Sequence, residues 1–203
     1  MISLSRLAAT YQLPTNLLYQ EKERILASGA AVIDLISGNV TEQGIRYPEE
    51  VIKEILSRAV ERSRIYRPHP LGQIPAREAV SDYYADRHIT IPPSQILLTP
   101  GRSLAYGYLF WIFANPDDEI LVPSPSYPLF DEIARLGGVK LVPYRLIESR
   151  SWAVDLEDLS RKIGARTKAV VLISPHHPTG AVVGEEELEA IASIAARHRL
   201  PIL

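Results

Sequence analysis

The 203-residue chain contains no cysteine. This absence excludes a disulfide framework, a thiolate zinc site and a cysteine nucleophile. Neither sign of charge dominates either, because 22 basic and 24 acidic residues give a net charge of −2. The charges are spread without blocks, which argues against nucleic acid as a partner.

Long apolar runs are also missing. Residues 1–13 have no apolar core of the length that a secretory signal peptide needs, and Leu109–Ala114 is too short to span a bilayer. We therefore expect a cytoplasmic protein that does not enter membranes. The 46% of hydrophobic residues still suffice to fill a sizeable core.

From residue 95 onward, short apolar segments alternate with helix-like segments. Strands are expected at 95–99, 119–122, 139–144 and 168–173, with helices at 102–114, 127–136, 155–163 and 185–198 and a last strand beginning at 200–203. Residues 169–173 are all apolar, as in a strand buried on both faces. The alternation predicts an α/β fold, a mainly parallel sheet with helices on both faces.

Before residue 95 the pattern is helical. Helices are expected over 15–28, behind Pro48, and over 75–87, with an irregular connector rich in proline and glycine between the last two. The helix after Pro48 should bury one apolar stripe, formed by Val51, Ile52, Ile55, Leu56, Ala59 and Val60. The chain stops inside the expected strand at 200–203, which would leave backbone groups unpaired. We therefore expect these residues to be the first part of a longer protein.

Two junctions between a strand and a helix carry polar turns that contain glycine. The first reads TPGRS at 99–103, and the second reads SPHHPTG at 174–180. In open α/β sheets, ligands bind where such turns leave the carboxyl ends of the strands. The two turns are therefore expected to form one site.

Four motifs together resemble those of class I/II aminotransferases, the fold-type I enzymes that use pyridoxal 5′-phosphate. They are YRPHPLG at 66–72, TPGRS at 99–103, VPSPSYPLF at 122–130 and SPHHPTG at 174–180. The resemblance covers about residues 33–203. It implies an N-terminal arm and part of a small domain over 1–45, and an incomplete cofactor-binding large domain over 46–203. It also implies a homodimer that moves an amino group between an amino acid and a 2-oxo acid.

The resemblance assigns the cofactor's phosphate to Gly101, Arg102 and Ser103. Free amides at a helix N-terminus and the helix dipole favour such a dianion, and Arg102 and the Ser103 hydroxyl can add charge and a further donor. The alternative is a turn glycine at 101 and a helix-capping serine at 103.

Three more residues take roles from the resemblance. Tyr127 would stack on the pyridine ring, Tyr66 would reach the phosphate bound by the partner subunit, and Gly38 would leave room for the substrate carboxylate. Each has a plainer alternative, because Tyr127 can be a core or surface tyrosine, Tyr66 a packed tyrosine at a helix end, and Gly38 a turn glycine.

His177 stands where the family normally has an asparagine that donates a hydrogen bond to the cofactor's phenolic oxygen. A neutral histidine can donate through one ring nitrogen, so binding can survive with altered electronics. The departure leaves open a nonstandard reaction or a loss of activity. The adjacent His176 and His177 predict no metal site, because neither cysteine nor clustered carboxylates accompany them.

No catalytic residue can be named. The family's cofactor-bound lysine, the acid at the pyridine nitrogen and the arginine for the substrate carboxylate are all expected beyond Leu203. The lysines present are expected on solvated helix faces or strand edges: Lys22, Lys53, Lys140, Lys162 and Lys168. We therefore expect this chain alone to be inactive, and its sequence does not specify the amino acid substrate.

Other functions remain open. A carbon–sulfur lyase, a cyclopropane-forming synthase or a decarboxylase of the same fold would share this half of the chain. A noncatalytic cofactor-binding or regulatory module is a further alternative. A nucleotide-binding α/β protein is disfavoured, because neither G-x-G-x-x-G nor a Walker A string occurs.

Overall fold

A computed structural model describes residues 3, 5, 8, 17–33 and 39–203 of the chain. The chain divides into two units, Met1–Pro70 and Leu71–Leu203, which are described separately. The boundary near residue 45, implied by the resemblance, stays a prediction.

The first unit contains helices α2 (Leu17–Ala27) and α3 (Glu49–Ser63). As predicted, α3 begins directly after Pro48, with Glu49 and Glu50 in its first turn, where the helix dipole favours acids. The predicted burial of its apolar stripe is wrong, since no residue of α3 is buried and Leu56 is 60% exposed. Periodicity marks the face that a helix can bury but does not supply a surface to cover it.

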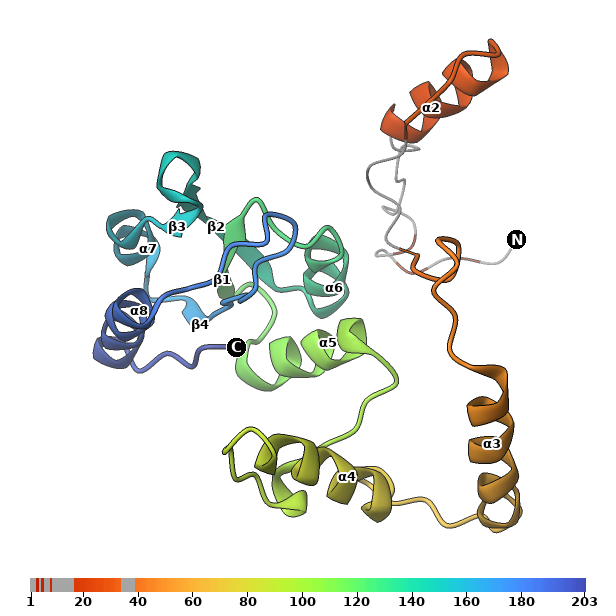
Figure 1. Ribbon diagram of the computed structural model, residues 1–203. Helices are drawn as coiled ribbons and strands as arrows, with labels where there is room; N and C mark the ends of the chain where they lie inside the picture. Colours follow the sequence, from red (N-terminus) through yellow and green to blue (C-terminus); the bar gives the residue numbers. More distant parts are fainter. Residues whose placement is uncertain (1–2, 4, 6–7, 9–16, 34–38) are drawn as a thin grey trace. The chain divides into compact units, whose positions relative to one another are not determined.

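The second unit contains the predicted alternation of helices and strands (Figure 1). Its elements are α4 (Ile74–Ala85), η1 (Pro93–Gln95), α5 (Arg102–Phe113), β1 (Glu119–Ser124), α6 (Phe130–Gly137), β2 (Lys140–Ile147), η2 (Glu148–Arg150), β3 (Ala153–Val154), α7 (Leu156–Lys162), β4 (Thr167–Val170) and α8 (Glu185–Arg197). The connector before α4 has no regular structure, as predicted.

The sheet has the strand order β3-β2-β1-β4. β1 pairs in parallel with both β2 and β4, and only the two-residue β3, which was not predicted, pairs antiparallel with β2. A parallel bridge from Val170 to Ile202 shows that the last residues do begin a strand beside β4. The predicted mainly parallel sheet is confirmed.

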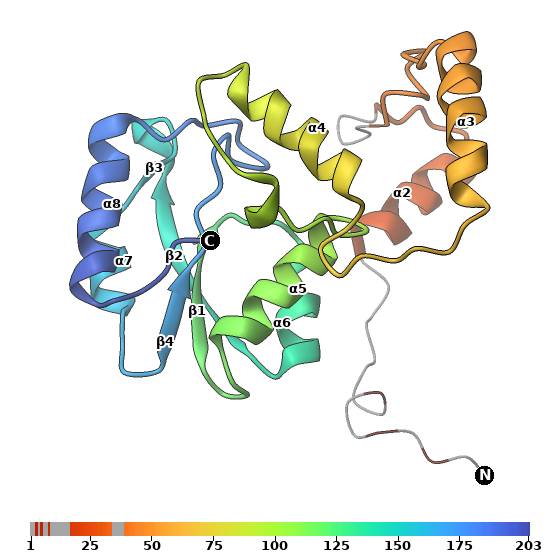
Figure 2. The same cartoon turned by 90° about the horizontal axis from the view of Figure 1, so that it is seen from below.

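The connections between the parallel strands run in opposite directions across the sheet. The chain first runs through α6 to β2, and later returns through α7 to β4 on the other side of β1. Because parallel crossovers are right-handed, the opposite directions place α6 on one face and α7 and α8 on the other (Figures 1 and 2). Helix α5 packs on the face of α6, in the same apolar core. The gap between β1 and β4 is a topological switch point, where α/β folds bind ligands.

Each face of the sheet has its own apolar core. Ile120 joins Phe110 and Phe130 on the side of α5 and α6, while Leu121 joins Tyr144 and Ile191 on the side of α7 and α8. Consecutive residues of β1 thus serve opposite faces, as the strand period requires. This explains why the central strands are apolar throughout.

The predicted strand at 95–99 is wrong. Pro93–Gln95 forms a 3₁₀ turn, and the extended residues that follow pair with no strand among the described residues. The Leu98 amide donates to the Leu71 carbonyl at 3.0 Å. An apolar segment becomes a strand only beside a neighbour that pairs with it, and a sequence pattern does not report that neighbour.

In the part of the chain that the structure describes, no helix combines the length and apolar character needed to cross a membrane.

Candidate active site

Helix α5 begins at Arg102 with an open N-terminus. No side chain caps it, and Ser103 lies inside the helix, so the alternative of a capping serine at 103 is wrong. Gly101 is extended, with φ 175° and ψ 166°, a conformation open to any residue. A Cβ atom built on Gly101 would meet nothing within 4 Å. The first turn of α5 thus offers backbone amides that no side chain caps, as an anion site requires.

Tyr127 lies in the loop between β1 and α6 and is half-buried. Its ring packs edge-on against Phe130, with centroids 5.5 Å apart and planes at 81°. Tyr106 of α5 contacts the same Phe130 ring at 4.7 Å and 80°. Tyr127 is thus supported by the apolar core on the α5 face while part of its ring stays accessible.

His177 lies in the turn that follows the buried segment after β4, and its ring is exposed. Its centroid is 5.9 Å from that of Tyr127, with the planes tilted by 57°. Burial raises the pKa of Tyr106, while the charge of nearby Arg102 lowers it and Tyr127 adds to the rise. Tyr127 and His177 follow the neighbouring parallel strands β1 and β4 and therefore lie at one end of the sheet, at the switch point.

The same loops contain two buried polar atoms without a partner. They are Ser126 Oγ and His176 Nε2, the unpaired buried side-chain atoms among the residues described. Such atoms are uncommon in folded proteins and point to a missing ligand, water or contact. Sequence reasoning considered His176 only as a metal ligand and missed that it is buried. The i, i+3 spacing of His176 and Thr179 in the turn was the available signal.

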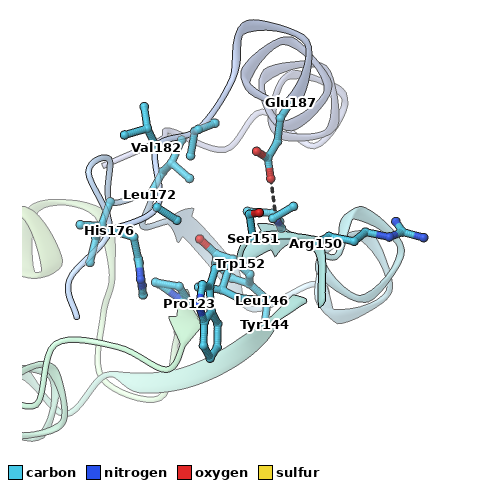
Figure 3. A pocket seen from close by; sticks show the side chains of 15 residues that line it. Pro123, Tyr144, Leu146, Arg150, Ser151, Trp152, Leu172, His176, Val182 and Glu187 are labelled. Atoms are coloured by element: carbon cyan, nitrogen blue, oxygen red, sulfur yellow. Dashed lines mark hydrogen bonds between the residues drawn. The ribbon is translucent and has the colours of Figure 1, made fainter. Parts of the chain in front are cut away.

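A cavity of about 110 Å³ lies on the other side of the sheet, towards α8 (Figure 3). Pro123, Trp152 and His176 line it together with Tyr144 and Glu187. The Tyr144 hydroxyl donates to the Val171 carbonyl at 2.8 Å, and burial raises its pKa. The Glu187 carboxylate accepts from the Val154 amide. Of these polar groups, the Nε2 atom of His176 lacks a hydrogen bond.

Two predicted site residues cannot be related to this end of the sheet. Tyr66 belongs to the first unit and is 90% exposed, and Gly38 lies outside the described residues.

Ion pairs involve Lys53, Lys140, Lys162 and Lys168, as expected of solvated helix faces and strand edges. The pairs are Lys53–Glu49, Lys140–Asp117, Lys162–Asp158 and Lys168–Asp118. No group of three or more histidine, aspartate or glutamate side chains that could hold a metal ion occurs among the described residues.

A family model described as aminotransferase class I and II matches residues 30–203. The chain belongs to this family. It is 32% identical over 185 residues to the glutamate-pyruvate aminotransferase AlaA of Haemophilus influenzae, covering 91% of this chain and 45% of that protein. It is 29% identical over 174 residues to human tyrosine aminotransferase, covering 85% of this chain and 38% of that protein.

Solved aminotransferases share the fold. Alanine aminotransferase from Pyrococcus furiosus superposes with a TM-score of 0.84 at 30% identity, over 98% of this chain and 51% of that one. A double mutant of Thermus thermophilus aspartate aminotransferase superposes with a TM-score of 0.83 at 29% identity, over 100% of this chain and 52% of that one. This aminotransferase chain thus spans about half the length of the relatives it matches, and its family implies pyridoxal phosphate as cofactor.

Proposed function

We propose that the complete protein is a pyridoxal phosphate-dependent aminotransferase, which moves an amino group between an amino acid and a 2-oxo acid. The observation that carries this proposal is the meeting of Tyr127 and His177 at the end of the sheet where α5 begins uncapped. Family membership over residues 30–203 supports it, and curated relatives are themselves named as aminotransferases. The isolated chain would be inactive, because the cofactor-bound lysine is expected beyond Leu203.

The residues present fit the phosphate end of the cofactor. The first turn of α5, which no side chain caps, offers amide donors for a phosphate. Arg102 adds a positive charge and Ser103 a hydroxyl donor, which together suit a dianion.

Tyr127 and His177 fit the ring of the cofactor. Tyr127 is held from behind by Phe130, so it can cover one face of an aromatic ring and exclude water from it. His177, exposed beside Tyr127, can donate a hydrogen bond from a ring nitrogen to the phenolic oxygen. When bound, pyridoxal phosphate supplies the electron sink that stabilises negative charge at the substrate's α-carbon.

The remaining roles concern the assembled enzyme. We propose a cytoplasmic homodimer in which Tyr66 reaches the phosphate bound by the partner subunit, and its exposed side chain is consistent with such a role. Gly38 would leave room for the substrate carboxylate.

Amino-group transfer by the intact protein tests the proposal. The ¹⁵N label of glutamate should appear in the amino acid made from an added 2-oxo acid, and only when pyridoxal phosphate is present. A carbon–sulfur lyase would instead release ammonia, a thiol and a 2-oxo acid without an acceptor. Ammonia release without transfer, or no reaction at all, would contradict the proposed aminotransferase.

A further inference from the structure

His176 is the centre of the hydrogen bonds that close the turn at 174–181. Its amide donates to the Ala181 carbonyl at 2.7 Å, and its carbonyl accepts from the Gly180 amide at 2.7 Å. Its Nδ1 atom lies 2.8 Å from the Thr179 hydroxyl, which also accepts from the Ala181 amide at 3.3 Å. The turn is therefore closed by backbone hydrogen bonds at residue 176 and by the contact of the His176 side chain with Thr179.

The imidazole ring of His176 is buried, with 6% of the residue exposed. It lies in the wall of the cavity shown in Figure 3, among Pro123, Trp152 and their neighbours. Burial lowers the pKa of His176, although the Pro125 carbonyl opposes part of the shift. The ring is thus held in its neutral form, which has one N–H group.

The two ring nitrogens of His176 have different surroundings. Nδ1 lies 2.8 Å from the Thr179 hydroxyl, whose oxygen accepts from the Ala181 amide. Nε2 is buried and lacks a hydrogen-bond partner among the described residues. His176 therefore contacts its own turn through Thr179, and it lines the cavity together with Pro123.

We propose that His176 is a positioning residue, which through its buried ring and its contact with Thr179 fixes the turn at 174–181 and so sets the spacing of Tyr127 and His177. Adjacent residues of the turn have different surroundings, since His176 is buried at the cavity while His177 is exposed beside Tyr127. The effect of His176 on cofactor affinity rests on the proposed function, whereas its effect on the spacing of Tyr127 and His177 does not.

The test uses the intact protein without cofactor and follows its histidine ring resonances by NMR. His177 lies 5.9 Å from Tyr127, so its ring shifts report the ring current of that tyrosine. His176→Leu and Thr179→Val should both move the His177 resonances, which a His177→Asn variant assigns. His176→Asn keeps a donor and an acceptor and should restore most of the shift. His198→Asn, at the exposed end of α8, is the control and should leave it unchanged.

Cofactor affinity provides the second measurement. Binding of pyridoxal 5′-phosphate should weaken about tenfold in His176→Leu and Thr179→Val, and less than about threefold in His176→Asn. Unchanged His177 resonances in folded Thr179→Val protein would overturn the proposal, whether or not His176→Leu folds. If the resonances move but the wild-type protein binds no cofactor, the proposed function fails while the positioning role stands.

Discussion

Tyr127 and His177 follow neighbouring parallel strands, and their rings lie 5.9 Å apart. Tyr106 links them to α5, because it packs on Phe130 from the α5 side and responds to the charge of Arg102. Backbone amides of α5 would hold an anion, Tyr127 would cover a ring, and His177 would donate to that ring's oxygen. Individual side chains thus supply separate parts of one proposed cofactor site.

Replacing Arg102 by leucine tests the phosphate role at the scale of a residue. Affinity for pyridoxal 5′-phosphate should fall about tenfold, because a charge-assisted hydrogen bond to the phosphate is lost. Affinity for pyridoxal, which has no phosphate, should stay the same. Both affinities are measured by titration of the intact protein, and Arg197→Leu at the end of α8 is the matched control. An equal loss for both ligands would contradict the assignment of Arg102.

His176 shows the limit of sequence reasoning at this scale. The motif SPHHPTG identified the turn, and family resemblance gave a role to His177. Whether a histidine in a turn is buried or exposed depends on segments distant in sequence, here the cavity wall at Pro123 and Trp152. Tyr106 was missed for a related reason, since its role comes from packing against Phe130 and not from a motif.

At the scale of elements, local signals predicted most helices and strands. Pro48 and the two glutamates after it mark the start of α3. The apolar run at 169–173 begins within β4 and continues past its end. The failures at 95–99 and on the stripe of α3 share one cause. Both segments are apolar, but an apolar segment becomes a strand only beside a pairing strand, and an apolar stripe is buried only beneath a covering surface. Local sequence specifies neither neighbour.

Helix α7 is held by a network of charges at Asp158. Its buried carboxylate accepts from the Arg145 amide at 2.9 Å and pairs with Lys162 at 2.8 Å and with Arg161 at 2.5 Å. The hydrogen bond from Lys162 contributes most to lowering the pKa of Asp158 to about 2. The carboxylate is therefore charged in the folded protein wherever it is charged in the unfolded chain.

Asp158→Asn should lower the free energy of unfolding at pH 7 by about 1–2 kcal/mol, because charge-assisted hydrogen bonds are lost. Because the pKa of Asp158 is lower in the folded protein, its carboxylate stabilises the fold at pH values above the ordinary carboxyl pKa. This stabilisation disappears as the pH falls from about 4 to about 2. Urea unfolding at several pH values measures the difference. Asp117→Asn, in an exposed pair with Lys140, is the control and should cost less. A difference between wild type and Asp158→Asn that persists unchanged at pH 2 would contradict this account.

At the scale of the whole molecule, the chain comprises two units and spans about half the length of its aminotransferase relatives. The phosphate and ring contacts proposed here come from the second unit, and Tyr66 comes from the first. The lysine, the acid and the arginine of the family belong to the proposed complete enzyme. The class of fold was predictable from the sequence, and the proposed site rests on four motifs, whereas the substrate was not predictable.

The most direct test of the central claim is a crystal structure of the intact protein grown with pyridoxal 5′-phosphate. The account predicts the phosphate within hydrogen-bonding distance of the first-turn amides of α5, at Arg102 and Ser103. It also predicts the pyridine ring stacked on Tyr127, with His177 at the phenolic oxygen. A phosphate bound away from α5, or a ring that contacts neither Tyr127 nor His177, would contradict it.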